Sequence, residues 1–179
     1  SNFFKFNKKK IINLKSGKII NIKDCVAYYK EKVISTLKNK KLNNKKIVID
    51  CANGSTYKIA KEIFTKFKLK VILINNKPNG TNINFACGSL YPQNVIKAVK
   101  KYSADFGISF DGDGDRIICC DEKGKIIDGD KILACLIKFY KEKKIMKING
   151  VVGTIMSNMG LENFVRNLGL KFYRSVVGD

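Results

Sequence analysis

Two hydrophobic periods alternate along this chain. Runs of four or five mostly apolar residues predict buried strands at 47–51, 71–74 and 106–110. Between these runs apolar residues recur every three or four positions, which predicts amphipathic helices at 59–67 and, opened by Pro92, at 92–102. A strand, a helix and a strand within about thirty residues form a βαβ unit, whose two strands are normally parallel.

The first part of the chain carries a weaker pattern. Residues 1–21 mix Lys and Asn with apolar residues, and we expect either an edge strand pair or the frayed end of a missing element. An amphipathic helix is predicted at 22–37, because Val26, Tyr29, Val33 and Leu37 share one helical face. The basic, Asn-rich stretch 38–46 predicts a connector at a domain boundary.

After the third strand the pattern predicts a β-hairpin. Its strands are expected at 117–120 and 125–127, around a turn at 121–124. Asp128 or Asp130 is expected to cap the next helix. The predicted apolar face of that helix holds Leu133, Leu136, Ile137 and Tyr140.

The C-terminal part begins a second unit of the same kind. A strand, a helix and a strand are predicted at 151–152, 161–168 and 171–176. The predicted fold class is therefore α/β, a mixed sheet flanked by helices followed by the start of a second similar α/β domain. The expected parts are the tail of one domain with a linker, a metal-binding domain and an incomplete domain, at 1–45, 46–143 and 148–179.

Three aspartates separated by single glycines follow the strand at 106–110. Asp111, Asp113 and Asp115 alternate with Gly, which lets the backbone fold tightly enough for the carboxylates to converge. An acidic hairpin turn is the alternative, since Asp-Gly is a common turn sequence. Carboxylates this close repel one another without a cation, and they are the hard ligands that Mg²⁺ or Ca²⁺ prefers. We therefore predict a metal site.

An EF-hand is the main competing interpretation of this loop. With Asp111 at the first position of a calcium loop, Glu122 falls at the twelfth, as such a loop requires. The sixth position requires Gly, however, and holds Arg116. The predicted flanking elements are also strands, whereas an EF-hand loop joins helices. A guanidinium beside metal-bound carboxylates is suited to holding a phosphate, so the loop indicates phosphoryl transfer.

Two other loops have functional candidates in them. Asn53-Gly54-Ser55-Thr56 opens a helix and could bind a phosphate, but it lacks the P-loop and dinucleotide spacings. We predict a structural turn in which Ser55 or Thr56 caps the helix. The Asn- and Gly-rich loop at 75–91 is long for a simple connector, which favours a functional role.

The net charge of +20 comes almost entirely from Lys, with Arg only at Arg116, Arg166 and Arg174. Because the lysines are spread over every segment, no specific nucleic-acid partner is expected. The six cysteines form no Cys-x-x-Cys pair and the chain has no His, so free thiols are expected and a zinc site or His-based triad is excluded. No apolar run suggests a membrane span or a signal peptide. The start lacks Met and the end lacks a polar tail, and we expect both ends to be cut.

The loop Asp111-Gly-Asp-Gly-Asp-Arg116 resembles the metal loop of the α-D-phosphohexomutase superfamily. Several other motifs are similar to those of bacterial phosphoglucosamine mutases: Val48-Ile-Asp-Cys-Ala-Asn-Gly54, Pro78-Asn-Gly-Thr-Asn-Ile-Asn84, Cys87-Gly-Ser89, Asp128-Gly-Asp130 and Gly150-Val-Val-Gly-Thr-Ile-Met-Ser-Asn158. The resemblance covers the chain from about residue 22 to its end. It implies a cytoplasmic four-domain enzyme, of which the chain holds the tail of the first domain, the second, and the start of the third.

The resemblance also implies a reaction and residue roles. A phosphoserine and Mg²⁺ would interconvert glucosamine 6-phosphate and glucosamine 1-phosphate, for UDP-N-acetylglucosamine synthesis. Asp111, Asp113 and Asp115 would hold Mg²⁺, Arg116 would be a catalytic residue beside the phosphoserine, and Gly178 and Asp179 would bind the phosphosugar. The family serine lies in a Ser-His-Asn-Pro type motif, and this chain has no His, so we expect it to be inactive alone. Another phosphohexomutase, a phosphomannomutase or phosphoglucomutase, or a non-enzymatic Ca²⁺-binding module are the alternatives.

Overall fold

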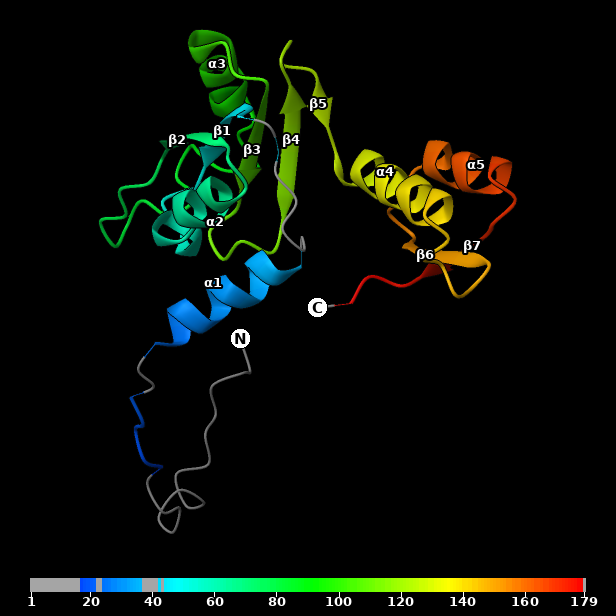
Figure 1. Cartoon of the computed structure of the whole chain (residues 1–179), viewed down its shortest axis with the longest axis horizontal. Helices are drawn as coiled ribbons and strands as arrows, with labels where there is room; N and C mark the ends of the chain where they lie inside the picture. Colours follow the sequence, from blue (N-terminus) through cyan, green and yellow to red (C-terminus); the bar gives the residue numbers. More distant parts are fainter. Residues whose placement is uncertain (1–16, 22–23, 37–41, 43, 179) are drawn as a thin grey trace, which may run out of the picture.

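The computed structural model describes residues 17–21, 24–36, 42 and 44–178 (Figure 1). Helix α1 spans Cys25–Ser35, in agreement with the helix predicted at 22–37, and it packs against a helix of the following domain. The element expected at 1–21 lies mostly outside the described residues, and 17–21 form neither helix nor strand. None of the described helices is long and apolar enough to cross a membrane.

The central domain is built on a mixed sheet of five strands in the order β2-β1-β3-β4-β5. β1 is parallel to β2 and β3, whereas β4 is antiparallel to β3 and β5. The strands are Lys46–Asp50, Lys70–Ile74, Phe106–Phe110, Ile117–Asp121 and Ile126–Ile127 for β1 to β5. The predicted βαβ unit, the hairpin and the α/β class are confirmed.

Two helices cover the two faces of this sheet, as the alternation along β1 requires. Ile47 and Ile49 point into a core that includes Ala60 of α2 (Ala60–Lys66). Val48 points the other way, into a core with Val95 and Val99 of α3 (Gln93–Tyr102). The carboxyl ends of β1, β2 and β3 therefore meet at one sheet edge, where ligands of such folds usually bind.

The C-terminal unit is a smaller α/β arrangement (Figure 1). β6 (Gly150–Thr154) pairs in parallel with β7 (Lys171–Ser175), and α5 (Met159–Asn167) connects them. α4 (Gly129–Glu142) shares the core of this unit, which contains Ile137, Val151, Leu161, Val165 and Leu170. The domain boundary predicted between 143 and 148 stays a prediction. Helix α4 lies before that boundary, yet it packs with the strands that follow it.

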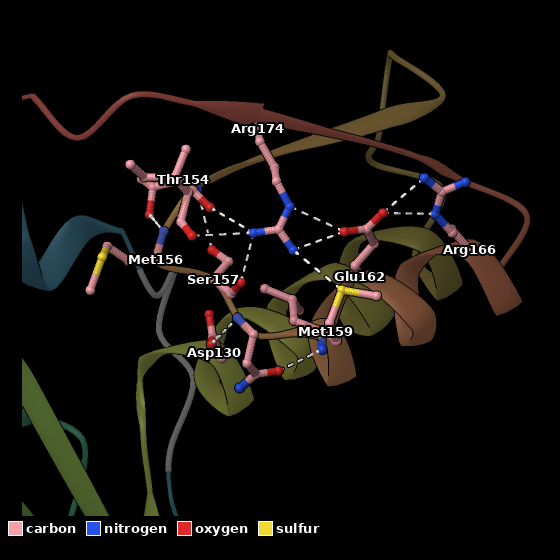
Figure 2. A network of polar contacts seen from close by, with 11 residues as sticks. Asp130, Thr154, Met156, Ser157, Met159, Glu162, Arg166 and Arg174 are labelled. Atoms are coloured by element: carbon pink, nitrogen blue, oxygen red, sulfur yellow. Dashed lines mark hydrogen bonds and ion pairs between the residues drawn. The ribbon is translucent and has the colours of Figure 1, made fainter.

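An arginine network fixes the turn after β6 (Figure 2). The Arg174 guanidinium donates to the Ser157 carbonyl at 2.7 Å and to Glu162 at 2.8 Å. Arg166 donates to the other oxygen of Glu162 at 2.8 Å. Hydrogen bonds from the two arginines lower the pKa of Glu162, and the larger effect comes from Arg174. Arg174 therefore ties β7 to both the β6 turn and helix α5.

Two local predictions about helices were wrong. Neither Ser55 nor Thr56 caps α2; both lie in a 3-10 turn at Ser55–Lys58, and Ile59 is the N-cap without a side-chain bond. On α4, Leu136 and Tyr140 are 44% and 43% exposed instead of buried, because the core lies along Leu133, Ala134 and Ile137. Of the two N-cap candidates for α4, Asp128 is the N-cap, and its side chain accepts a hydrogen bond from the Lys131 amide.

The cysteines are free thiols, as expected from their spacing. Burial raises the pKa of Cys51 and of Cys119 to about 11, which keeps both protonated and unreactive at neutral pH. Cys51, Cys87 and Cys120 are buried and Cys119 is half-buried, whereas Cys25 and Cys135 are exposed. Several of the six therefore act as small apolar core residues.

The Asp128 cap gives a pH-dependent prediction. The hydrogen bond from the Lys131 amide lowers the pKa of Asp128, so its contribution is present above its unfolded pKa and is lost as pH falls through its folded pKa. We expect Asp128→Ala to lower the free energy of unfolding by about 1 kcal/mol at pH 7 and by less below pH 3. Urea unfolding at both pH values measures this. Asp128→Asn is the matched control, because Asn caps equally well and does not titrate; an equal loss from Asp128→Ala at both pH values would contradict the assignment.

Candidate metal centre

The three aspartates lie in the tight connection between antiparallel strands β3 and β4. One carboxylate oxygen from each of Asp111, Asp113 and Asp115 lies within 4.8 Å of the others. Asp111 is 2% exposed, and Asp113 and Asp115 are exposed. Since their strands fix both ends of the loop, the carboxylates converge at the carboxyl end of β3, where the sequence predicted them.

Asp111 is the structural centre of the loop. Its Oδ1 accepts from the Gly114 amide at 3.2 Å and the Arg116 amide at 3.1 Å, and its Oδ2 accepts from Arg116 Nε at 2.6 Å. Burial raises the pKa of Asp111, but the hydrogen bonds from Arg116 outweigh it and the net pKa is lowered. The carboxylate is therefore ionised, and Oδ2 has one lone pair left for a cation.

Arg116 bridges two of the aspartates. Its Nε also lies 3.5 Å from Asp115 Oδ1, and its side chain is 67% exposed. The pKa of Arg116 is raised by Asp111. Partial desolvation within the loop and the neighbouring carboxylates Asp111 and Asp113 raise the pKa of the exposed Asp115. The loop thus holds more negative charge than one guanidinium neutralises, which favours a bound cation.

The turn after β1 packs directly on the aspartate loop. The Ser55 amide donates to the Gly112 carbonyl at 2.7 Å, and Ser55 Oγ donates to the Asp113 carbonyl at 3.0 Å. A Cβ on Gly54 would lie 2.1 Å from the Gly112 oxygen. Ser55 therefore binds the backbone of the aspartate loop instead of capping α2. Only Gly fits at position 54, because any side chain there would clash with this loop.

Sequence reasoning missed Asp50. This residue ends β1, is 0% exposed, and accepts three hydrogen bonds, from Ala52 N, Asn75 Nδ2 and Gly88 N. Burial raises the pKa of Asp50, and the three hydrogen bonds oppose that rise. The available signal was a carboxylate that directly follows the apolar residues 47–49 of a strand and must find partners at the sheet edge.

Gly178 and Glu122 are not part of the aspartate loop. Gly178 is exposed, and no atom outside its chain neighbours would lie within 4 Å of a Cβ placed on it. Asp179 lies outside the described residues. Glu122 is in the turn between β4 and β5, one strand length from the aspartates, on the order of 17 Å. Strands on both sides of the loop and this position of Glu122 exclude an EF-hand.

The chain matches two parts of one protein family. Residues 26–124 match "Phosphoglucomutase/phosphomannomutase, alpha/beta/alpha domain II", and residues 128–179 match domain III of the same family. A phosphoglucosamine mutase from Thermodesulfovibrio yellowstonii is 49% identical over 91% of the chain and 36% of its own length. One from Pelagibacter ubique is 54% identical over 77% of the chain and 31% of its own length. The chain thus spans about a third of the length of these relatives.

Solved structures give the same result for the fold. A phosphoglucomutase/phosphomannomutase family protein from Burkholderia thailandensis superposes with a TM-score of 0.72 at 23% identity, over 85% of the chain and 33% of that structure. The Aspergillus fumigatus N-acetylphosphoglucosamine mutase, solved with glucose 1,6-bisphosphate, gives 0.61 at 25% identity, over 84% and 32%. The arrangement of α/β units described above is therefore that of known phosphosugar mutases.

Proposed function

The chain belongs to the phosphoglucomutase/phosphomannomutase family, and from this membership we propose that it is the metal-binding central part of a phosphoglucosamine mutase. The reaction proposed for the whole protein is the interconversion of glucosamine 6-phosphate and glucosamine 1-phosphate through a phosphoserine. The convergence of three aspartates at the carboxyl edge of the sheet carries this proposal. The phosphoglucosamine mutase relatives support the choice of sugar.

Asp111, Asp113 and Asp115 are the proposed ligands of Mg²⁺. They offer hard oxygen atoms, and the spare lone pair on Asp111 Oδ2 and the exposed positions of the other two fit a cation approached from solvent. When bound, Mg²⁺ supplies charge neutralisation for a phosphoryl group. Ca²⁺ usually takes six to eight oxygens, often including a bidentate Glu, whereas Mg²⁺ keeps several waters and needs few carboxylates. The short three-carboxylate loop therefore favours Mg²⁺.

Arg116 is the proposed contact to the transferring phosphoryl group. Within the described part of the chain, its guanidinium donates through Nε alone, and its two terminal amino groups form no hydrogen bond or ion pair. Those two groups present a planar pair of donors that suits phosphate oxygens. The anchored Nε holds the guanidinium beside the metal ligands, so one side chain orients both charges.

The enzymatic proposal is tested on the chain and on the full-length protein. With glucosamine 6-phosphate, Mg²⁺ and a sugar bisphosphate activator, we expect no turnover from the chain and production of glucosamine 1-phosphate by the full-length protein. Phosphorus NMR follows both sugar phosphates. Turnover by the chain alone would refute the proposal that the catalytic serine lies in a separate domain. A higher kcat/KM of the full-length protein for glucose or mannose phosphates than for glucosamine phosphates would refute the proposed sugar.

A further inference from the structure

Asp50 is a buried carboxylate that the proposed chemistry does not use. It is 0% exposed, and its three donors are neutral: Ala52 N at 2.9 Å, Asn75 Nδ2 at 2.9 Å and Gly88 N at 3.2 Å. No Lys or Arg among the described residues forms an ion pair with it. Burying a carboxylate without a counter-ion costs free energy. We therefore expect Asp50 to have a role that offsets this cost.

The groups that donate to Asp50 belong to segments that hold the aspartate loop. Ala52 begins the turn whose Ser55 binds the carbonyls of Gly112 and Asp113. Gly88 is followed by Ser89, whose amide donates to the Phe110 carbonyl at 2.9 Å, one residue before the first aspartate. Asp50 thus accepts hydrogen bonds from two supporting segments of the aspartate loop. The segment at 84–89 contacts the start of the loop, and the turn at 51–55 contacts its middle.

Both supports have unfavourable backbone conformations. Left-handed φ angles occur in these segments at the non-glycine residues Ala52 (51°), Asn53 (48°), Asn84 (57°) and Ala86 (49°), and also at Asn75 (47°), which follows β2. Alanine has no side-chain hydrogen bond to offset such a conformation. Clustered backbone strain persists only where surrounding contacts enforce it, and Asp50 accepts directly from one backbone amide in each segment, Ala52 N and Gly88 N.

We propose that Asp50 is a positioning residue for the metal loop, holding the turn at 51–55 and the segment at 84–89 so that the three aspartates are gathered before a cation binds. This inference rests on the proposed metal site. A carboxylate is required because Oδ1 accepts on one side and Oδ2 accepts twice on the other. Asn at this position would turn an amide group toward one of the donors and leave that segment unsupported.

The test compares metal affinity with global stability. Mn²⁺, a divalent ion with the same preference for oxygen ligands, is titrated into the chain, and free Mn²⁺ is measured by electron paramagnetic resonance. We expect Asp50→Asn to raise the Kd for Mn²⁺ about tenfold, as loss of supporting hydrogen bonds does at other metal sites. Val99→Ala is the control, because it perturbs the α3 core on the other face of the sheet and should leave the Kd unchanged.

Two further variants keep the inference falsifiable if Asp50→Asn does not fold in urea-unfolding controls. Asn75→Gly removes a donor to Asp50 at a left-handed position that Gly tolerates, and Ser55→Ala removes one bond to the Asp113 carbonyl. Each should raise the Kd several-fold. Wild-type Kd in Asp50→Asn, or in Asn75→Gly if the first does not fold, overturns the positioning role. Absence of Mn²⁺ binding by the unmodified chain instead refutes the proposed metal site and the inference with it.

Discussion

Replacing Asp113 and Asp115 together by Asn should lower the affinity for Mg²⁺ by roughly 100-fold or more while leaving the fold intact, since loss of a direct ligand should cost more than the 10- to 100-fold seen for supporting residues. Both side chains are exposed, so they contribute little to the core. Partial desolvation and nearby carboxylates raise the pKa of Asp115, so removal of the charges relieves repulsion in the metal-free loop. We expect an unchanged or slightly higher free energy of unfolding, measured in urea without metal.

Glu122→Gln is the matched control for this double substitution. It also removes an exposed carboxylate from the same hairpin, but at the far end of β4. Calorimetric Kd values for Mg²⁺ should therefore change only in the aspartate variant. Equal losses in both variants would mean that the net charge of the surface, and not a metal site, attracts the ion.

Gly54→Ala should lower the free energy of unfolding by about 3 kcal/mol and disrupt the aspartate loop. The added methyl would lie 2.1 Å from the Gly112 oxygen and 2.5 Å from its Cα. Both are backbone atoms, so no side-chain rotation relieves the clash, and either the β1 turn or the aspartate loop must move. Urea unfolding and Mn²⁺ binding measure the two consequences.

Gly129→Ala provides the comparison for Gly54. Apart from its chain neighbours and the backbone of its own helix, no atom lies within 4 Å of a Cβ at position 129, which is the first residue of α4. This substitution should be neutral or stabilising by up to about 1 kcal/mol, because Ala is a better helix former. Gly54→Ala with the stability and the metal affinity of the unmodified chain would contradict the close packing of the two loops.

Most of the fold could be predicted from the sequence because its periodicity is local. The strand at 106–110 was predicted at its observed bounds, since turn-forming residues limit the apolar run at both ends. The role of Ser55 could not be predicted, because the partner of its hydroxyl is the Asp113 carbonyl, 58 residues away. The apolar face of α4 depended on the strands that follow it, β6 and β7.

The candidate site divides in the same way. Asp111, Asp113, Asp115 and Arg116 were recognisable because their spacing along one loop carries the chemistry. Asp50 was not, because two of its donors lie 25 and 38 residues along the chain and meet it only where parallel strands end together. The proposed metal ligands are thus visible as a motif, whereas their support depends on tertiary structure.

Titration calorimetry of the chain with Mg²⁺ and with Ca²⁺ tests the central claim most directly. We predict one Mg²⁺ per chain, bound at the aspartate loop, with binding lost in the Asp113→Asn and Asp115→Asn double variant and retained in Glu122→Gln. A preference for Ca²⁺ over Mg²⁺ by orders of magnitude would contradict a phosphate-handling Mg²⁺ site.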